Sequence, residues 1–213
     1  KAEDERDVCY NINVLGTKNI ANACAVVDAK MVYISTDYVF DGEGTKPFEV
    51  TDKPNPINYY GQTKYEGEME VQKILSKYFI VRISWVFGNN GNNFVKTLLR
   101  IGKERGEISV VADQVGSPTY TFELAGLLLE MIATDKYGIY HVTNEGFCSW
   151  YEFACEIFKQ VGLDVKVNPI KTEDYPTRAK RPKNSRLEKH KNQSFKSLSY
   201  WKFALSNFLE VGI

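Results

Sequence analysis

The chain has 213 residues, of which 43% are hydrophobic and 25% charged, and its 27 basic residues balance its 27 acidic ones. A chain of this length can bury a full core, and a net charge near zero argues against a dedicated nucleic-acid or membrane-surface binder. No apolar run approaches the roughly 20 residues that cross a bilayer and no signal peptide is visible, so we expect a cytoplasmic protein.

Predicted helices and strands alternate along the chain. Apolar residues at helical spacing predict a helix over 5–27, and a short apolar run predicts a buried strand over 31–35. Further helices are predicted over 60–76, 93–104, 122–132, 150–161 and 196–210, and further strands over 79–83, 108–111, 139–142 and 165–167. Strands separated by helices imply right-handed crossovers and a mainly parallel sheet.

One helix opens with a pattern that is typical of acid–base chemistry. Tyr60 and Lys64 form the only Y-x-x-x-K in the chain, and residues four apart lie on one face of a helix. A nearby ammonium favours the phenolate, so Lys64 is predicted to lower a tyrosine pKa that is normally about 10. Thr36, at the end of the preceding strand, is placed to hold a reacting oxygen. The pattern predicts a carbonyl reduction site, with an ordinary helix-surface contact as the alternative.

Six segments carry a family resemblance. They are STDYVFDG at 35–42, YGQTKYEGE at 60–68, RISWVFG at 82–88, GNNF at 91–94, DQVGSPT at 113–119 and RPKNS at 181–185. Together they resemble the dTDP-4-dehydrorhamnose reductases, a family of extended short-chain dehydrogenases/reductases, essentially from end to end. The Tyr/Lys pair alone marks the superfamily, whereas the first and last segments together point to the reductase branch.

The resemblance implies an α/β fold, with a Rossmann-like, doubly wound parallel sheet that binds NAD(P) and a smaller α/β substrate-binding region. It assigns 1–88 and 121–142 to the remainder of the dinucleotide-binding domain, and 89–120 and 143–213 to the substrate-binding region. None of the 15 glycines supplies the glycine-rich first turn that such a sheet uses for pyrophosphate. We therefore expect a fragment that lacks the N-terminal strands and binds cofactor poorly by itself, the activity being that of the parent protein.

The activity that the resemblance implies is the NAD(P)H-dependent reduction of dTDP-4-dehydro-6-deoxy-L-mannose to dTDP-L-rhamnose, a step in polysaccharide biosynthesis. Tyr60 would donate the proton, Thr36 would bind the carbonyl oxygen, and Lys64 would hold the nicotinamide ribose. Tyr60, Lys64 and Ser35 are the predicted cofactor contacts, although a strand position favours a structural role for Ser35. The choice between NADPH and NADH stays open, and Mg²⁺ is left open by the family without being indicated by the sequence.

The resemblance also predicts substrate contacts in the sugar pocket and in a basic loop over the substrate. These residues are Thr36, Asp37, Tyr38, Trp85, Asn92, Asn93, Arg181, Asn184 and Ser185. Arginine suits a nucleotide diphosphate because its donors form a fork. Plainer alternatives stay open: turn residues at Asp37 and Tyr38, a core side chain at Trp85, and a solvated loop around Arg181.

Two other functions stay open at this point. One is a non-catalytic regulatory subunit of a methionine adenosyltransferase, a relative of the same family, and the other is a related nucleotide-sugar epimerase. The expected partner is a dTDP-sugar, with no nucleic acid and no membrane, and a homodimer is compatible with the sequence. The four cysteines form no C-x-x-C and the two histidines have no ligand cluster, so we expect reduced thiols and no metal site.

Overall fold

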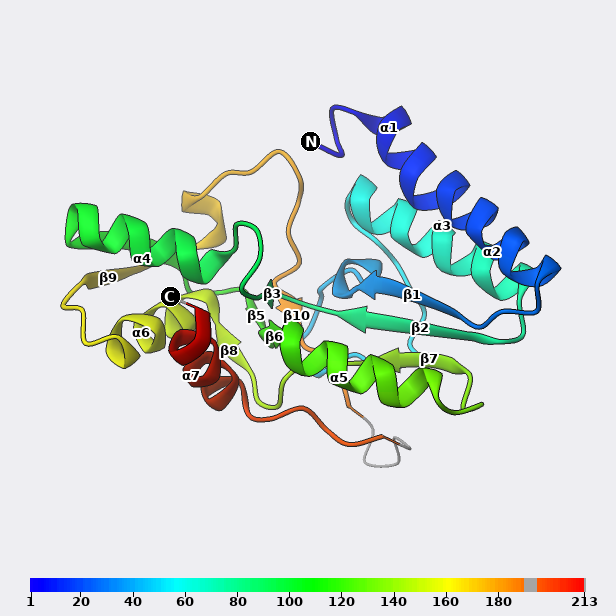
Figure 1. Ribbon diagram of the computed structural model, residues 1–213. Coiled ribbons are helices and arrows are strands. Elements are labelled where there is room, and N and C mark those ends of the chain that lie inside the picture. The colour runs from blue at the N-terminus through cyan, green and yellow to red at the C-terminus, as the bar shows by residue number, and fades with distance from the viewer. Residues whose placement is uncertain (190–194, 213) are drawn as a thin grey trace.

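A three-stranded parallel sheet forms one end of the molecule in the computed structural model, which describes residues 1–189 and 195–212 (Figure 1). Its strand order is β1 (Met31–Thr36), β2 (Tyr78–Ile83) and β7 (Gly138–His141). The registers align Met31 with Tyr78 and Phe79 with Gly138. All but the first residue of β2 is buried, as expected of a central strand covered on both faces.

Helices cover both faces of this sheet (Figure 1). On one face lie α3 (Tyr59–Ile74) and a continuous helical run made of α1 (Arg6–Tyr10), a π-helical stretch (Asn11–Gly16) and α2 (Thr17–Val26). On the other lies α5 (Thr121–Ile132). The predicted doubly wound α/β arrangement is confirmed.

The opposite end of the molecule is a second packed unit. There β4 (Glu107–Val111) pairs in parallel with β9 (Lys166–Ile170), and α4 (Phe94–Arg105), α6 (Trp150–Gln160) and α7 (Trp201–Gly212) pack around a core rich in aromatic rings. Side-chain caps mark the start of α4 and of α6. Asn93 accepts a hydrogen bond from the Lys96 amide at the start of α4, and Ser149 and Glu152 form a reciprocal capping box at the start of α6.

Short strands and turns join the two ends. β3 (Val86–Phe87) pairs with β6 (Thr119–Tyr120), and β5 (Val115–Gly116) lies between β8 (Cys148–Ser149) and β10 (Asn184–Ser185). Two 3₁₀ turns, η2 (Asp37–Val39) and η3 (Thr172–Asp174), complete the elements of the described residues. These connections bring the loop that ends in β10 against the middle of the molecule.

The last helix differs from its predicted bounds. It begins at Trp201 instead of 196 because the preceding residues are held in other contacts. The Ser199 amide and hydroxyl donate to the Glu123 carboxylate at 3.0 and 2.7 Å, and the Ser199 carbonyl accepts from the Glu145 amide at 2.9 Å. Within the described part of the chain, no helix combines the length and apolarity needed to cross a membrane.

Candidate active site

The end of β1 and the start of α3 lie against each other. Thr36 closes β1, and its hydroxyl accepts a hydrogen bond from the Tyr38 amide at 3.2 Å. Asn58 caps α3 by accepting from the Gly61 amide at 2.8 Å. A Cβ atom at Gly61 would lie 2.1 Å from the Tyr38 carbonyl oxygen, so only glycine allows the helix to approach the turn this closely.

Tyr60 faces Thr36 across this contact. The Thr36 hydroxyl is close enough to act on the Tyr60 phenol, and the Tyr60 ring meets the edge of the Tyr38 ring with centroids 6.0 Å apart. Although 38% of Tyr60 is accessible to solvent, its hydroxyl is crowded. Burial and the neighbouring Asp37 charge raise its pKa above the usual value, while the Thr36 contact opposes the rise. Tyr60 is therefore a protonated phenol at neutral pH, the form that a proton donor needs.

The prediction that Lys64 lowers the Tyr60 pKa is wrong for this arrangement, because the ammonium is directed elsewhere. The Lys64 Nζ lies over the Tyr33 ring, 3.9 Å from its centroid. Burial lowers the pKa of Lys64 to about 8, and the charge of Glu68 opposes that shift. Over residues 1–189 and 195–212, Nζ has neither a hydrogen bond nor an ion pair. It is a donor available to a hydroxyl-bearing ligand.

Asp37 is a buried carboxylate with spare acceptor capacity. The residue is 5% exposed, and its Oδ1 accepts from the Thr36 hydroxyl at 3.1 Å. Its Oδ2 has no hydrogen-bond partner within the described chain. Burial raises the pKa of Asp37 to about 6, while contacts with Ser185 and Thr36 oppose the rise. A buried acceptor without a partner is costly, so a ligand hydroxyl would be well bound here.

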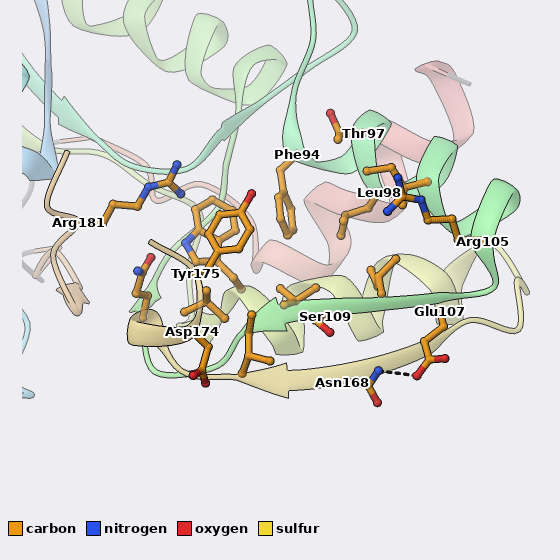
Figure 2. A pocket seen from close by; sticks show the side chains of 17 residues that line it. Phe94, Thr97, Leu98, Arg105, Glu107, Ser109, Asn168, Asp174, Tyr175 and Arg181 are labelled. Carbon is orange, nitrogen blue, oxygen red and sulfur yellow. Dashed lines mark hydrogen bonds between the residues drawn. The ribbon is translucent and has the colours of Figure 1, made fainter. Parts of the chain in front are cut away.

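A pocket of about 940 Å³ opens in the second unit, between α4, β4, β9 and the loop that leads to Arg181 (Figure 2). Its lining combines aromatic rings with a few charged groups. Figure 2 shows Arg181 and Tyr175 at one end, Phe94 near the middle, and Arg105 with Glu107 at the other. Apolar walls with a small number of polar groups are the usual form of a site for an organic ligand.

Trp85 connects this pocket to the Tyr60 region. Its ring stacks on Trp150, a lining residue, with centroids 3.6 Å apart and planes 12° apart. The Trp85 backbone has φ +49°, a left-handed conformation that is uncommon for a large residue. On its other side, a Cβ atom at Gly116 would lie 2.9 Å from the Trp85 ring and 3.0 Å from the Ser185 Cβ. Ser185 in turn lies beside Asp37, so Trp85, Gly116 and Ser185 form a series of contacts from the pocket residue Trp150 to that carboxylate.

The structure brings most of the predicted site residues together. Arg181 lines the pocket, and its positive charge opposes the burial that raises the pKa of Tyr38 to about 12. Ser185 lies beside Asp37. The predicted contact of Ser35 with the cofactor stays a prediction. Its buried hydroxyl donates to Glu68 at 2.5 Å.

Three predicted amide contacts lie differently. The Asn184 Nδ2 donates to the Lys46 carbonyl at 2.7 Å, which ties β10 to the segment that follows β1. The Asn93 amide donates to the Gly88 carbonyl at 2.7 Å in addition to capping α4. Asn92 is exposed. The polar groups of Asn93 and Asn184 are already engaged in holding the fold.

Sequence reasoning missed three aromatic residues of the pocket, Phe94, Trp150 and Tyr175. The sequence itself holds part of the signal for one of them. Ser149-x-x-Glu152 before an apolar run is a capping-box pattern, and it places Trp150 at the first position of a helix. Nothing in the local sequence indicates that Phe94 or Tyr175 faces the same space.

Comparisons with known proteins agree with this geometry. A family model described as the RmlD substrate binding domain matches residues 1–212. The chain is 43% identical to a dTDP-4-dehydrorhamnose reductase of Aggregatibacter actinomycetemcomitans, over 97% of this chain and 75% of the relative. It is 39% identical to the spore coat polysaccharide biosynthesis protein SpsK of Bacillus subtilis, over 99% of this chain and 74% of that protein.

A solved structure is similar over the same extent. The crystal structure of dTDP-4-dehydrorhamnose reductase from Bacillus anthracis in complex with NADP superposes with a TM-score of 0.96 and 48% sequence identity. The superposition covers 98% of this chain and 75% of that one.

Proposed function

The chain belongs to the RmlD substrate binding domain family, and from that premise we propose that it reduces the 4-keto group of dTDP-4-dehydrorhamnose to give dTDP-L-rhamnose, at the expense of a reduced nicotinamide cofactor. One observation carries the proposal. The Tyr60 phenol at the start of α3 lies near the Thr36 hydroxyl at the end of β1, with Lys64 one turn further along α3.

The residues divide the proton chemistry between them. In the complex, the Thr36 hydroxyl would turn its single proton from Asp37 to the carbonyl oxygen. A carbonyl oxygen that accepts hydrogen bonds from Thr36 and Tyr60 is polarised toward the charge that develops as its carbon is reduced. Tyr60, protonated at neutral pH, then gives its proton to the forming alkoxide. Thr36 is fixed by the Tyr38 amide, so the oxygen has a defined place before reaction.

Part of a nicotinamide site fits the described residues. The Lys64 ammonium, without an ion pair in the described chain, can donate to ribose hydroxyls beside Tyr60. When bound, the reduced nicotinamide supplies the hydride. The reductase from Bacillus anthracis that this chain resembles was solved with NADP.

The substrate extends from this point toward the pocket. Asp37, with one oxygen free among the described residues, is the proposed acceptor for a sugar hydroxyl, and Trp85 forms the wall of the sugar site. Arg181 is placed to bind the diphosphate at the mouth of the pocket, and the aromatic lining suits a nucleobase. No observation favours the regulatory subunit or the epimerase that the sequence left open.

The proposal is tested by incubating the complete protein with NADPH and dTDP-4-dehydrorhamnose and following the nicotinamide absorbance. Oxidation of NADPH with one equivalent of dTDP-L-rhamnose formed, identified by mass spectrometry, is the expected result. dTDP-glucose, which has no 4-keto group, serves as the control substrate. A protein that binds both ligands and oxidises no NADPH would contradict the proposal.

A further inference from the structure

A buried ion pair lies one helical turn along α3 from Lys64. Glu68 is fully buried and Arg82 is 2% exposed. The Arg82 Nε and Nη2 donate to the two carboxylate oxygens of Glu68 at 2.9 and 2.7 Å, and the Ser35 hydroxyl donates to the first oxygen at 2.5 Å. Partners from β2 and β1 therefore occupy both oxygens of this carboxylate.

The helical spacing makes Lys64 a competitor for the same carboxylate. Side chains at i and i+4 are neighbours on a helix, and opposite charges at this spacing pair readily. In the structure the Lys64 Nζ lies over the Tyr33 ring, and within the described residues it forms no ion pair. The two charges nonetheless act on each other, because Glu68 opposes the lowering of the Lys64 pKa.

We propose that Arg82 is a positioning residue of the reaction: by holding the Glu68 carboxylate, it keeps the Lys64 ammonium free to bind the nicotinamide ribose. The inference rests on the proposed function for the ribose, but the state of Lys64 can be measured without turnover. Breaking a buried pair on one side leaves an uncompensated charge. Glu68 without Arg82 would recruit Lys64, which is the nearest cation on its own helix.

Other groups surround the two charges. Around Lys64 lie Cys9 of α1 and Tyr33 of β1. Around Arg82, its Nη1 lies 3.4 Å from the Nε2 of His141 on β7, and its guanidinium lies over the Phe40 ring at 5.1 Å. None of these contributes a carboxylate, so Glu68 is the acid that can capture Lys64.

The test compares Arg82→Met with the double variant Glu68→Gln/Arg82→Met in the complete protein. In protein without nucleotide, the rate of Lys64 acylation by an amine-selective reagent is measured across pH by peptide mass spectrometry. Only the neutral amine reacts, so pairing with Glu68 in Arg82→Met should raise the apparent Lys64 pKa by about one unit and slow the reaction about tenfold at pH 7. NADPH binding, measured by fluorescence, should weaken about tenfold.

The double variant separates positioning from folding. With no carboxylate at 68, Lys64 should regain its reactivity and the NADPH affinity should return to within about threefold of wild type. Arg82→Lys, which keeps the charge and loses the fork, takes the place of Arg82→Met if that variant does not fold by circular dichroism, with an expected effect of about threefold.

Two results would overturn the proposal. One is an unchanged Lys64 titration in the folded single variant, and the other is a double variant as impaired as the single one, which would give the pair a purely structural role. The failure of the proposed function is a different result. If the variants show the Lys64 response but the wild-type protein does not reduce the keto sugar, the proposed function is contradicted and the positioning role of Arg82 stands.

Discussion

The reacting end of the site and its pocket are built from different kinds of residue. At the reacting end, hydroxyl, carboxyl and ammonium groups all come from residues 36–64, and contacts of about hydrogen-bond length fix Thr36 to Asp37 and to Tyr38. The pocket draws aromatic rings and two exposed guanidinium groups, those of Arg105 and Arg181, from residues 94–181. The first region is small and polar, and the second is wide and largely apolar.

The difference follows from the two tasks. Proton transfer needs groups whose positions are fixed to within a few tenths of an ångström. A strand end and a helix start in direct contact can provide that precision. Recognition of a large ligand needs area, which only segments far apart in sequence can enclose. Changes at the reacting end should therefore act on turnover and cofactor binding, and changes at the pocket on the KM of the sugar nucleotide.

Tyr60→Phe is the strongest test of this division. Removing only the phenol hydroxyl should lower kcat of the complete protein about 10²–10⁴-fold, the usual contribution of a positioned acid. The KM for the sugar nucleotide should change less than about threefold, because the pocket is untouched. Steady-state kinetics measure both. Turnover within threefold of wild type would remove Tyr60 as the proton donor.

Lys64→Met tests the cofactor side of the reacting end. Loss of a charged donor to the ribose should weaken NADPH binding about 10–100-fold. The wild type should lose affinity as pH rises through the Lys64 pKa of about 8, because the ammonium is present below that value and lost above it. The variant should show no such loss. Equal NADPH dissociation constants for the two proteins at pH 7 would contradict the assignment.

The sequence predicts that Thr36, Tyr60 and Lys64 lie near one another because this geometry is local. A Tyr and a Lys four apart on one helix share a face whatever the rest of the fold does, and Thr36 follows from the strand that precedes the helix. The direction of the Tyr60 pKa shift could not be predicted in the same way. It depends on burial and on Asp37, and on Lys64 being directed over Tyr33.

The pocket and the amide contacts are much less predictable. Trp150 faces the same space as Arg181 only because β8, β5 and β10 form one small sheet. The family motifs predict substrate contacts at Asn93 and Asn184, but a motif does not say whether a side-chain amide binds a ligand or caps a helix. The proposed division of the chain into 1–88 with 121–142, and 89–120 with 143–213, stays a prediction.

Asp37→Asn tests whether the reacting end carries a stability cost. The folded pKa of about 6 lies above the ordinary value of 3.8, so ionisation of Asp37 opposes folding. The favourable contribution of the protonated carboxyl is complete below the unfolded pKa and is lost as pH rises through 6. The variant should therefore be more stable than wild type at pH 7.5, by about 1–3 kcal/mol. The gain should shrink toward pH 4. Denaturant titrations at several pH values measure it, and a gain that is independent of pH would contradict the assignment.

Arg181→Lys should have the smallest effect and tests the pocket most directly. Lysine keeps the positive charge but loses the planar fork that holds a diphosphate at two points. We expect the KM for the sugar nucleotide to rise about three- to tenfold, with kcat nearly unchanged, because Tyr60 and Thr36 are not altered.

Lys180→Ala is the matched control: it removes a positive charge from an exposed side chain of the same loop, so it reports the general electrostatic contribution. If Arg181→Lys left the KM unchanged while Lys180→Ala raised it, the loop would act only through its overall charge. A fall in kcat with an unchanged KM would instead place Arg181 at the reacting end and break the division between the two regions.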